Sequence, residues 1–203
     1  MKTSKKILEV GNIKFDEPNR VDRLLDRLFL WIIPSFARPN HLTLLRYLMV
    51  PIVFYFVLFE SYLSGFIFFC LAVFTDALDG ALARTRGMIT DWGKLHDPLA
   101  DKLLIGISGA VLVTRYIGVE IILTIIFLEF LTVISAIHLH DDKEKEIGAR
   151  LPGKIKMVCQ SLGIGLLFLF PLLEIRIFIF LAQVLLYAAI VFSSLNVIIY
   201  KSL

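Results

Sequence analysis

The sequence predicts an all-α integral membrane protein with six transmembrane helices and an N-terminal amphipathic helix that lies in the membrane interface. Hydrophobic residues make up 58% of the 203 residues, whereas a soluble domain averages about 45–50% apolar residues. Apolar runs of about 20 residues, long enough to cross a bilayer, recur along the chain. Lys and Arg are concentrated before the first run and in every second connection, and six crossings place all of these segments on the same side of the membrane.

Residues 1–41 are predicted to form a cytoplasmic N-terminal segment, because they carry eight Lys and Arg residues. They contain no apolar stretch of the kind found in signal peptides. Within this segment, residues 18–36 place apolar side chains on one helical face and arginines on the others. The apolar face consists of Val21, Leu24, Leu25, Leu28 and Trp31. This pattern favours a helix that lies in the interface, and the alternative is a solvated helix that packs on the protein's own surface.

Residues 42–203 are predicted to form one transmembrane domain. The expected spans cover residues 42–60, 62–83, 98–115, 117–138, 156–173 and 176–199. Connections 84–97 and 139–155 are expected to be longer charged loops, and the other connections are very short. Since the short turns of the opposite side offer only Arg115 and Arg176, both termini and the longer loops are predicted to be cytoplasmic in a multi-pass cell-membrane protein.

Four aspartates stand out at the end of the second span and the start of the third. Asp76 and Asp79 share a helical stripe with Gly80 and Ala83, and Asp97 and Asp101 share a second stripe with Gly93. The pair Asp97–Pro98 is expected to start the third helix, because proline is tolerated in a first turn. Two helices joined by a cytoplasmic loop would thus point two carboxylates each into one cleft.

These carboxylates predict a pair of metal ions. A charged side chain at membrane depth costs about 2.5–3.5 kcal/mol even on insertion scales, so a cation must compensate. Carboxylate oxygens are the preferred ligands of Mg²⁺ and Mn²⁺, and four of them can hold two ions. Such a pair can clamp a diphosphate while one carboxylate deprotonates a hydroxyl, which indicates phosphoryl-transfer chemistry. A solvated helix end explains a lone D-x2-D but not four aspartates at this spacing.

The spacing D-x2-D-G-x2-A-R-x8-G-x3-D-x3-D resembles the signature of the CDP-alcohol phosphatidyltransferase family, with no departure at its fixed positions. These positions are Asp76, Asp79, Gly80, Ala83, Arg84, Gly93, Asp97 and Asp101. The resemblance extends loosely over the six-span architecture and the stretch from Pro39 and Asn40 to Thr43. It implies an enzyme in which a second alcohol displaces CMP from a CDP-linked lipid or alcohol.

The resemblance also implies roles for individual residues. Asp101 would be the catalytic base for the acceptor hydroxyl. Two Mg²⁺ or Mn²⁺ ions would be held by Asp76, Asp79, Asp97 and Asp101. The CDP moiety would be bound by Asp79, Gly80, Ala83, Arg84 and Gly93. Family members are commonly homodimers, and the expected partners are a CDP-lipid such as CDP-diacylglycerol, a small polar alcohol and the lipid bilayer, with no nucleic acid.

The acceptor is suggested by two further stretches, Asp97–Leu104 and Gly153–Lys156 followed by Gln160. Both resemble the phosphatidylglycerophosphate synthases of this family, whose acceptor is glycerol 3-phosphate. An anionic acceptor needs cations, and the candidates are Arg150, Lys154 and Lys156. Those synthases usually carry an Arg-Glu-Phe pattern and a later arginine in the fourth span, where this chain has Leu128-Glu129-Phe130 and His138. Inositol phosphate, serine and phosphatidylglycerol therefore remain alternative acceptors.

An ion or proton transporter that uses the aspartates as a relay is the alternative from another class. Relay acids are expected throughout the membrane rather than at one interface, and the chain shows no paired broken helices. A catalytically inactive subunit is disfavoured because every signature aspartate is present. Two charged residues stay open: Glu129 faces the cleft or makes an interhelical bond, and Arg46 snorkels to the headgroups or reaches the cleft.

Overall fold

The computed structural model describes residues 24–30, 38–86, 88, 90–138 and 143–201. Within these ranges the secondary structure is helical, with one short π-helical segment followed by six long helices. They are η1 (Asp26–Leu30), α2 (Pro39–Leu58), α3 (Tyr62–Thr85), α4 (Asp91–Tyr116), α5 (Val119–His138), α6 (Lys143–Leu173) and α7 (Ile177–Lys201). The prediction of an all-α protein is thus confirmed for the described part of the chain.

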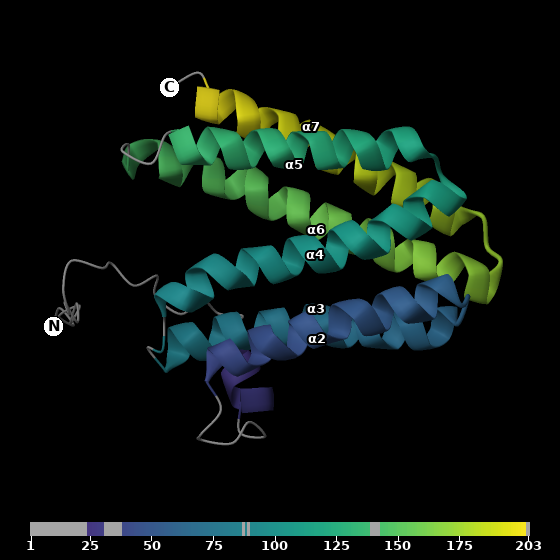
Figure 1. The fold of residues 1–203 in the computed structure, drawn as a ribbon, viewed down its shortest axis with the longest axis horizontal. Helices are drawn as coiled ribbons and strands as arrows, with labels where there is room; N and C mark the ends of the chain where they lie inside the picture. The colour runs from purple at the N-terminus through teal and green to yellow at the C-terminus, as the bar shows by residue number, and fades with distance from the viewer. Residues whose placement is uncertain (1–23, 31–37, 87, 89, 139–142, 202–203) are drawn as a thin grey trace, which may run out of the picture.

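The long helices run up and down in an elongated bundle (Figure 1). α2 and α3 lie side by side, α4 packs on α2, and α4 also contacts α5 and α6. α6 and α7 form the other extensive pair, and α5 packs on α7. The connection between α3 and α4 and the end of α7 lie at the same end of the bundle (Figure 1). We call it the aspartate end, because Asp76 and Asp79 lie in the last turns of α3, which ends there at Thr85.

Apolar side chains fill the middle of the bundle and also cover much of its outside. Val53, Val57, Leu112 and Phe168 are among the fully buried residues of one continuous core. Large apolar residues on every long helix remain exposed, for example Leu48, Ile67, Leu103, Phe127, Val158 and Phe180. An apolar exterior of this kind fits a surface that faces lipid tails rather than water.

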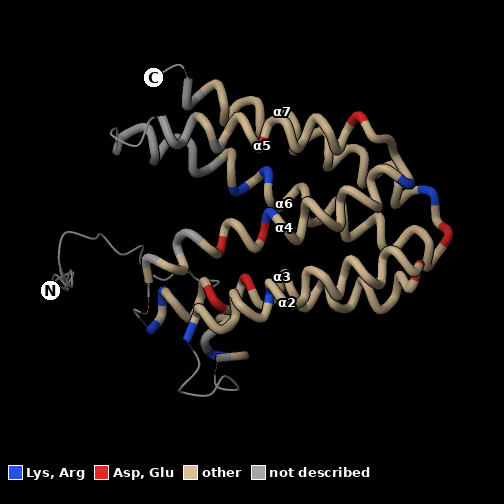
Figure 2. The backbone as a smooth tube through the Cα atoms, in the orientation of Figure 1, with Lys and Arg blue, Asp and Glu red and all other residues tan. Residues whose placement is uncertain are grey.

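Four helical stretches in the described part of the chain are long and apolar enough to cross a membrane. They are Pro39–Leu58, Tyr62–Thr85, Pro152–Leu173 and Ile177–Ile198. Charged residues lie in the half of the bundle at the aspartate end and at the tip of the opposite end, with uncharged stretches of helix between them (Figure 2). The chain is therefore a helical membrane protein, and crossings by α4 and α5, which would bring the total to six, stay a prediction.

The predicted start of the third helix at Asp97–Pro98 is wrong. α4 begins at Asp91, where the hydroxyl of the N-cap residue Thr90 accepts a hydrogen bond from the Gly93 amide at 3.0 Å. Pro98 lies inside the helix, and only the carbonyl one turn earlier loses its backbone donor. The predicted loop 84–97 therefore shrinks to residues 86–90.

The second predicted loop, 139–155, is also mostly helical. α6 begins at Lys143 and continues through Pro152, while residues 139–142 lie outside the described residues. The early turns contain Lys, Glu, Ala and Arg, which are good helix formers, so the helix continues where the charge pattern indicated a loop.

Only a small part of the predicted amphipathic helix 18–36 lies within the described residues. Its described part, residues 24–30, contains η1 and packs on α3, where the rings of Phe29 and Phe74 meet edge to face at 5.0 Å. Leu25 packs against Leu78, Ala81 and Leu82 of the same helix. These contacts agree with packing on the protein's own surface, and the interfacial placement stays a prediction.

Candidate active site

Arg46 of α2 lies at the centre of the predicted aspartate cluster and is fully buried. Its Nη1 donates to Oδ1 of Asp101 at 2.6 Å, and its Nη2 donates to Oδ2 of Asp79 at 2.5 Å. The same Nη2 lies 3.0 Å from Oδ1 of Asp76. One guanidinium thus joins three of the four predicted aspartates, which come from two different helices.

The helical geometry explains why these side chains converge. Asp76 and Asp79 stand three residues apart on α3, and Asp97 and Asp101 stand four apart on α4, so each pair shares one helical face. α2 packs on both α3 and α4, and its residue Arg46 therefore reaches both pairs. Asp79 is buried at 3% exposure while Asp76 is 44% exposed, so the cluster opens toward solvent or headgroups on the Asp76 side.

Asp97 is held by a different residue of α2. The hydroxyl of Thr43, which is fully buried, donates to Oδ1 of Asp97 at 2.5 Å. Nearer the start of each helix, the Thr90 hydroxyl donates to Oδ1 of Asn40 at 2.7 Å. The stretch from Pro39 to Thr43, which the sequence linked only loosely to the family, therefore fixes the start of α4 and one of its carboxylates.

The small residues of the signature lie against the charged ones. A Cβ atom added to Gly93 would stand 3.3 Å from Oδ2 of Asp97 and 3.1 Å from the Thr90 hydroxyl. A Cβ atom added to Gly80 would stand 3.0 Å from Nη2 of Arg84, so the exposed Arg84 side chain folds over Gly80 near the Asp76 and Asp79 turn. Ala83 is half-buried on the same helix. Each glycine thus leaves a charged side chain room that a methyl group would take.

The donor set suits a hard divalent cation, although its present arrangement is centred on a guanidinium. Arg46 pairs with three of the four carboxylates and Thr43 binds the fourth, and Nε of Arg46 has no hydrogen-bond partner. In the described part of the chain, no three acidic, histidine or cysteine side chains are close enough together to hold an ion. The negative charge left over is what Mg²⁺ or Mn²⁺ would neutralise.

A second polar cluster lies where α4, α5 and α6 meet. Nζ of Lys156 lies 2.7 Å from Oε1 of Glu129, and Nζ of Lys102 lies 3.6 Å from Oε2 of the same carboxylate. Gln160 donates to Oε1 of Glu129 at 3.5 Å. Both Lys156 and Gln160 are buried, and all four residues line a cavity of about 150 Å³. Glu129 therefore joins three helices.

The predicted acceptor residues separate in the structure. Lys156 lies in this cluster, Lys154 is exposed, and the side chain of Arg150 lies outside the described side chains. Lys102 was not predicted, although it directly follows Asp101. The available signal was that Lys102 follows Asp101. This signal is weak, because successive side chains of a helix point about 100° apart and need not reach the same cluster.

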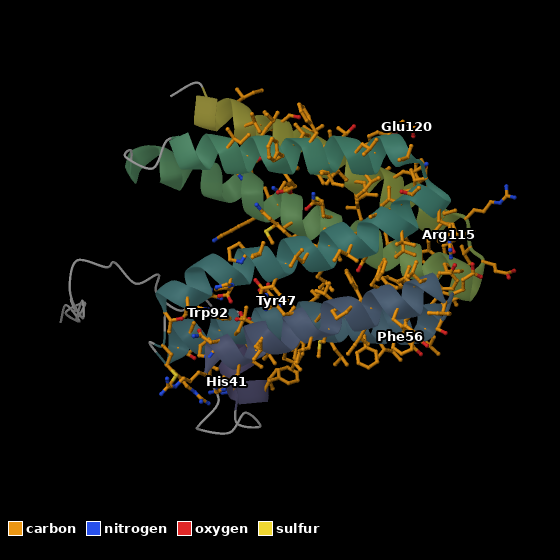
Figure 3. All side chains as sticks on the ribbon, in the orientation of Figure 1. His41, Tyr47, Phe56, Trp92, Arg115 and Glu120 are labelled. Atoms are coloured by element: carbon orange, nitrogen blue, oxygen red, sulfur yellow. The ribbon has the colours of Figure 1, made fainter. Side chains whose placement is uncertain are left out.

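An aromatic group borders Asp97 on the other face of α4. The rings of Trp92 and His96 stack at 4.1 Å, and the Tyr47 hydroxyl lies 3.3 Å from Nδ1 of His96 and donates to its backbone carbonyl at 3.2 Å. Tyr47 and Trp92 both lie toward the aspartate end, whereas Arg115 and Glu120 lie at the opposite end (Figure 3). The sequence pattern did not single out this group.

The fold and the site define a helical membrane protein in which carboxylates from two helices surround one arginine at one end of the bundle. Residues 36–195 match the profile of the CDP-alcohol phosphatidyltransferase family. The chain belongs to this family, which confirms the resemblance inferred from the signature.

Three curated relatives illustrate the similarity. A CDP-diacylglycerol–glycerol-3-phosphate 3-phosphatidyltransferase of Rickettsia typhi is 39% identical over 71 residues, which are 34% of this chain and 40% of that protein. A protein of Mycobacterium tuberculosis named as a probable phosphatidylglycerophosphate synthase is 35% identical over 146 residues, 66% of each chain. A CDP-diacylglycerol–glycerol-3-phosphate 3-phosphatidyltransferase of Bacillus subtilis is 32% identical over 150 residues, 66% of this chain and 77% of the relative. The match thus spans about two fifths of the Rickettsia protein and more of the others.

Proposed function

We propose that the protein transfers a phosphatidyl group from CDP-diacylglycerol to a hydroxyl of glycerol 3-phosphate and releases CMP. The observation that carries this proposal is the convergence of Asp76, Asp79 and Asp101 on Arg46, with the family signature intact around them. The names of the curated relatives supply the donor and the acceptor.

The aspartates divide the work in this proposal. Asp76, Asp79, Asp97 and Asp101 would hold two Mg²⁺ or Mn²⁺ ions, whose charge would neutralise the diphosphate and the departing CMP. Gly80, Ala83, Arg84 and Gly93 line the CDP site, with Asp79 at its edge. Arg84 presents a guanidinium, which suits a phosphate because its donors match two oxygens at once.

The bond changes follow from the positions of these groups. The acceptor hydroxyl oxygen forms a bond to the lipid-side phosphorus, while the bond from this phosphorus to the bridging oxygen of CMP breaks. Asp101 accepts the hydroxyl proton, and CMP leaves with the bridging oxygen. Arg46 supports this step by holding Oδ1 of Asp101 at 2.6 Å, which fixes the orientation of the base.

The acceptor's phosphate is bound, in this proposal, at the cluster of Lys102, Lys156, Gln160 and Glu129. The two lysines supply the positive charge that the missing arginines of the fourth span would otherwise provide. Arg150 and Lys154 precede Lys156 on α6 and contribute long-range attraction for the acceptor's phosphate. The excess of two ammonium groups over one carboxylate favours an anionic acceptor over serine.

We also infer six crossings, a cytoplasmic active site and a homodimer. α4 with 26 residues and α5 with 20 residues are at least as long as α2, which has 20. The positive charges of the longer connections favour the cytoplasm for the aspartate end, where α2 begins and α7 ends (Figure 1). The family resemblance supports the homodimer.

The test is acceptor-dependent release of CMP by the purified protein in detergent, with CDP-diacylglycerol and Mg²⁺. We expect release with glycerol 3-phosphate and no release above background without an acceptor. Release only with inositol phosphate, serine or phosphatidylglycerol would retain the chemistry and overturn the acceptor. Absence of release with every acceptor, in Mg²⁺ and in Mn²⁺, would contradict the proposed reaction.

A further inference from the structure

The cavity at the lysine cluster is a cleft whose lining residues run along the helices. At the aspartate end it is lined by Lys102, Glu129 and Lys156, and its far part is lined by Val113, Ile122 and Ile164. From Lys102 to Val113, α4 rises about 16 Å at about 1.5 Å per residue. α4 packs on both α5 and α6 around it, as their positions in Figure 1 show. The lining of the cleft thus extends along the bundle over about this length.

Below the lysines the walls of the cleft are apolar. Ile105, Ile125 and Leu186 are buried side chains that line it. A Cβ atom added to Gly106 would meet no other atom within 4 Å, so this glycine borders open space. A buried water needs polar partners, and an apolar cavity engineered in a soluble protein stays dry and binds apolar molecules instead. The lower part of the cleft therefore suits a hydrocarbon ligand.

The mouth of the cleft carries an excess of positive charge. Lys102 and Lys156 share one carboxylate, Glu129, and its Oε2 has no hydrogen-bond partner because Lys102 stays 3.6 Å away. Ile126, which is half exposed on α5, also lines the cleft, so the cleft opens sideways toward the lipid. The mouth thus suits an anionic group, and the part below it suits an apolar chain.

We propose that the cleft between α4, α5 and α6 binds one acyl chain of the CDP-linked diacyl lipid. Lys102 directly follows Asp101, so the mouth of the cleft lies at the same level of α4 as the centre where the lipid's phosphate reacts. The acceptor's phosphate then lies on the Lys156 side of the same mouth, above the chain. This inference rests on the proposed function, and it makes Gly106 a specificity-determining residue because its missing side chain leaves the space that the chain fills.

The test uses CDP-diacylglycerol with a photoactivatable diazirine in one acyl chain, followed by mass spectrometry of the cross-linked peptides. Cross-links are expected on the cleft-lining residues of α4 and α5. Gly106→Leu should lower the yield of these cross-links by about fivefold or more. The leucine side chain and the acyl chain would compete for the same space, as side chains do in an overpacked core. Gly106→Ala, which adds a single methyl group, should lower the yield less. Leu103→Phe enlarges a lipid-exposed side chain of the same helix and is the matched control with unchanged cross-linking.

Two results would overturn the inference. One is cross-linking confined to outward residues such as Leu123 and Phe127, or unaffected by either Gly106 variant. The other is equal cross-linking by a diazirine-labelled phosphatidylglycerol that competes with the CDP-lipid, which would indicate a general lipid site. CMP release measured on the same preparations separates this test from the proposed function: cross-linking in the cleft without release would contradict the reaction alone, and release without cross-linking in the cleft would contradict the chain site alone.

Discussion

Arg46 shows how a single residue organises the active centre. Its guanidinium is fully buried and bridges Asp76, Asp79 and Asp101. It therefore supplies positive charge that the sequence analysis expected from metal ions. One positive charge cannot balance four carboxylates, and removing one partner of a buried ion pair leaves the others uncompensated. The divalent ions of the proposed site would therefore act on the same charges as Arg46.

Replacing Arg46 tests this relation. In EDTA, Arg46→Met should lower the free energy of unfolding by about 3–5 kcal/mol, the cost of breaking a buried ion pair. Mg²⁺ should restore part of this loss, because its charge neutralises the carboxylates that the variant leaves unpaired. The measurement is the thermal unfolding midpoint of the protein in detergent, with and without Mg²⁺. Arg115→Met, which removes an arginine paired with Glu60 at the opposite end, is the control. Equal Mg²⁺ effects on both variants would contradict a shared role.

The sequence predicted some of these residues and missed others for a physical reason. Spacing within one helix placed Asp76 with Asp79 and Asp97 with Asp101, because side chains three or four residues apart share a face. The role of Arg46 depends on how α2 packs against two other helices, and the pattern of α2 alone leaves it open. Lys102 was missed for the same reason, since its partner Glu129 belongs to a different helix.

At the scale of elements, the start of α4 controls the geometry of the site. The helix begins seven residues before Pro98 because Thr90 caps it, and the same hydroxyl donates to Asn40 on α2. The sequence rule that proline marks a first turn favoured the later start, and it failed because an earlier cap was available. The early turns bring Gly93 and Asp97 into the site on one continuous helix.

A pair of substitutions at Thr90 tests the cap. Thr90→Ala removes the hydroxyl and should lower the free energy of unfolding by about 1 kcal/mol, the usual value of an N-cap. Asp97 lies two turns into the helix, so a loosened helix start would also shift this carboxylate. The Michaelis constant for the CDP-lipid should therefore rise as well. Thr90→Ser keeps the hydroxyl and should stay near wild type in both measurements, which are thermal unfolding in detergent and the kinetics of CMP release. If the serine and alanine variants behaved alike, the hydroxyl would have no such role.

At the scale of the whole molecule, the bundle divides its functions between two groups of helices. α2, α3 and α4 carry the aspartate centre, while α5 and α6 add Glu129, Lys156 and Gln160 next to α4. The number and approximate positions of the long helices followed from hydropathy and length. Which helices pack together did not, because lipid and protein interior are about equally apolar and the pattern of apolar residues gives little preference for one face.

Membrane orientation gives a prediction at this scale. The aspartate end should face the cytoplasm, because Lys and Arg are concentrated in the connections at that end. The test replaces Cys70 and Cys159, the free cysteines of the described residues, and introduces single cysteines at the exposed positions Met88 and Glu174. A membrane-impermeant maleimide applied to intact cells should label position 174 and spare position 88. The reverse pattern would place the active site outside.

The central claim is that the aspartate cluster carries out phosphatidyl transfer with Asp101 as the base. The most direct measurement compares CMP release by Asp101→Asn with that by the wild-type protein, alongside Mg²⁺ binding by calorimetry. Loss of a general base should slow release by about 10²–10⁴-fold, while one or both ions still bind through the remaining aspartates. Glu120→Gln, an exposed change at the opposite end, should release CMP at the wild-type rate. Release by Asp101→Asn at the wild-type rate would contradict the account.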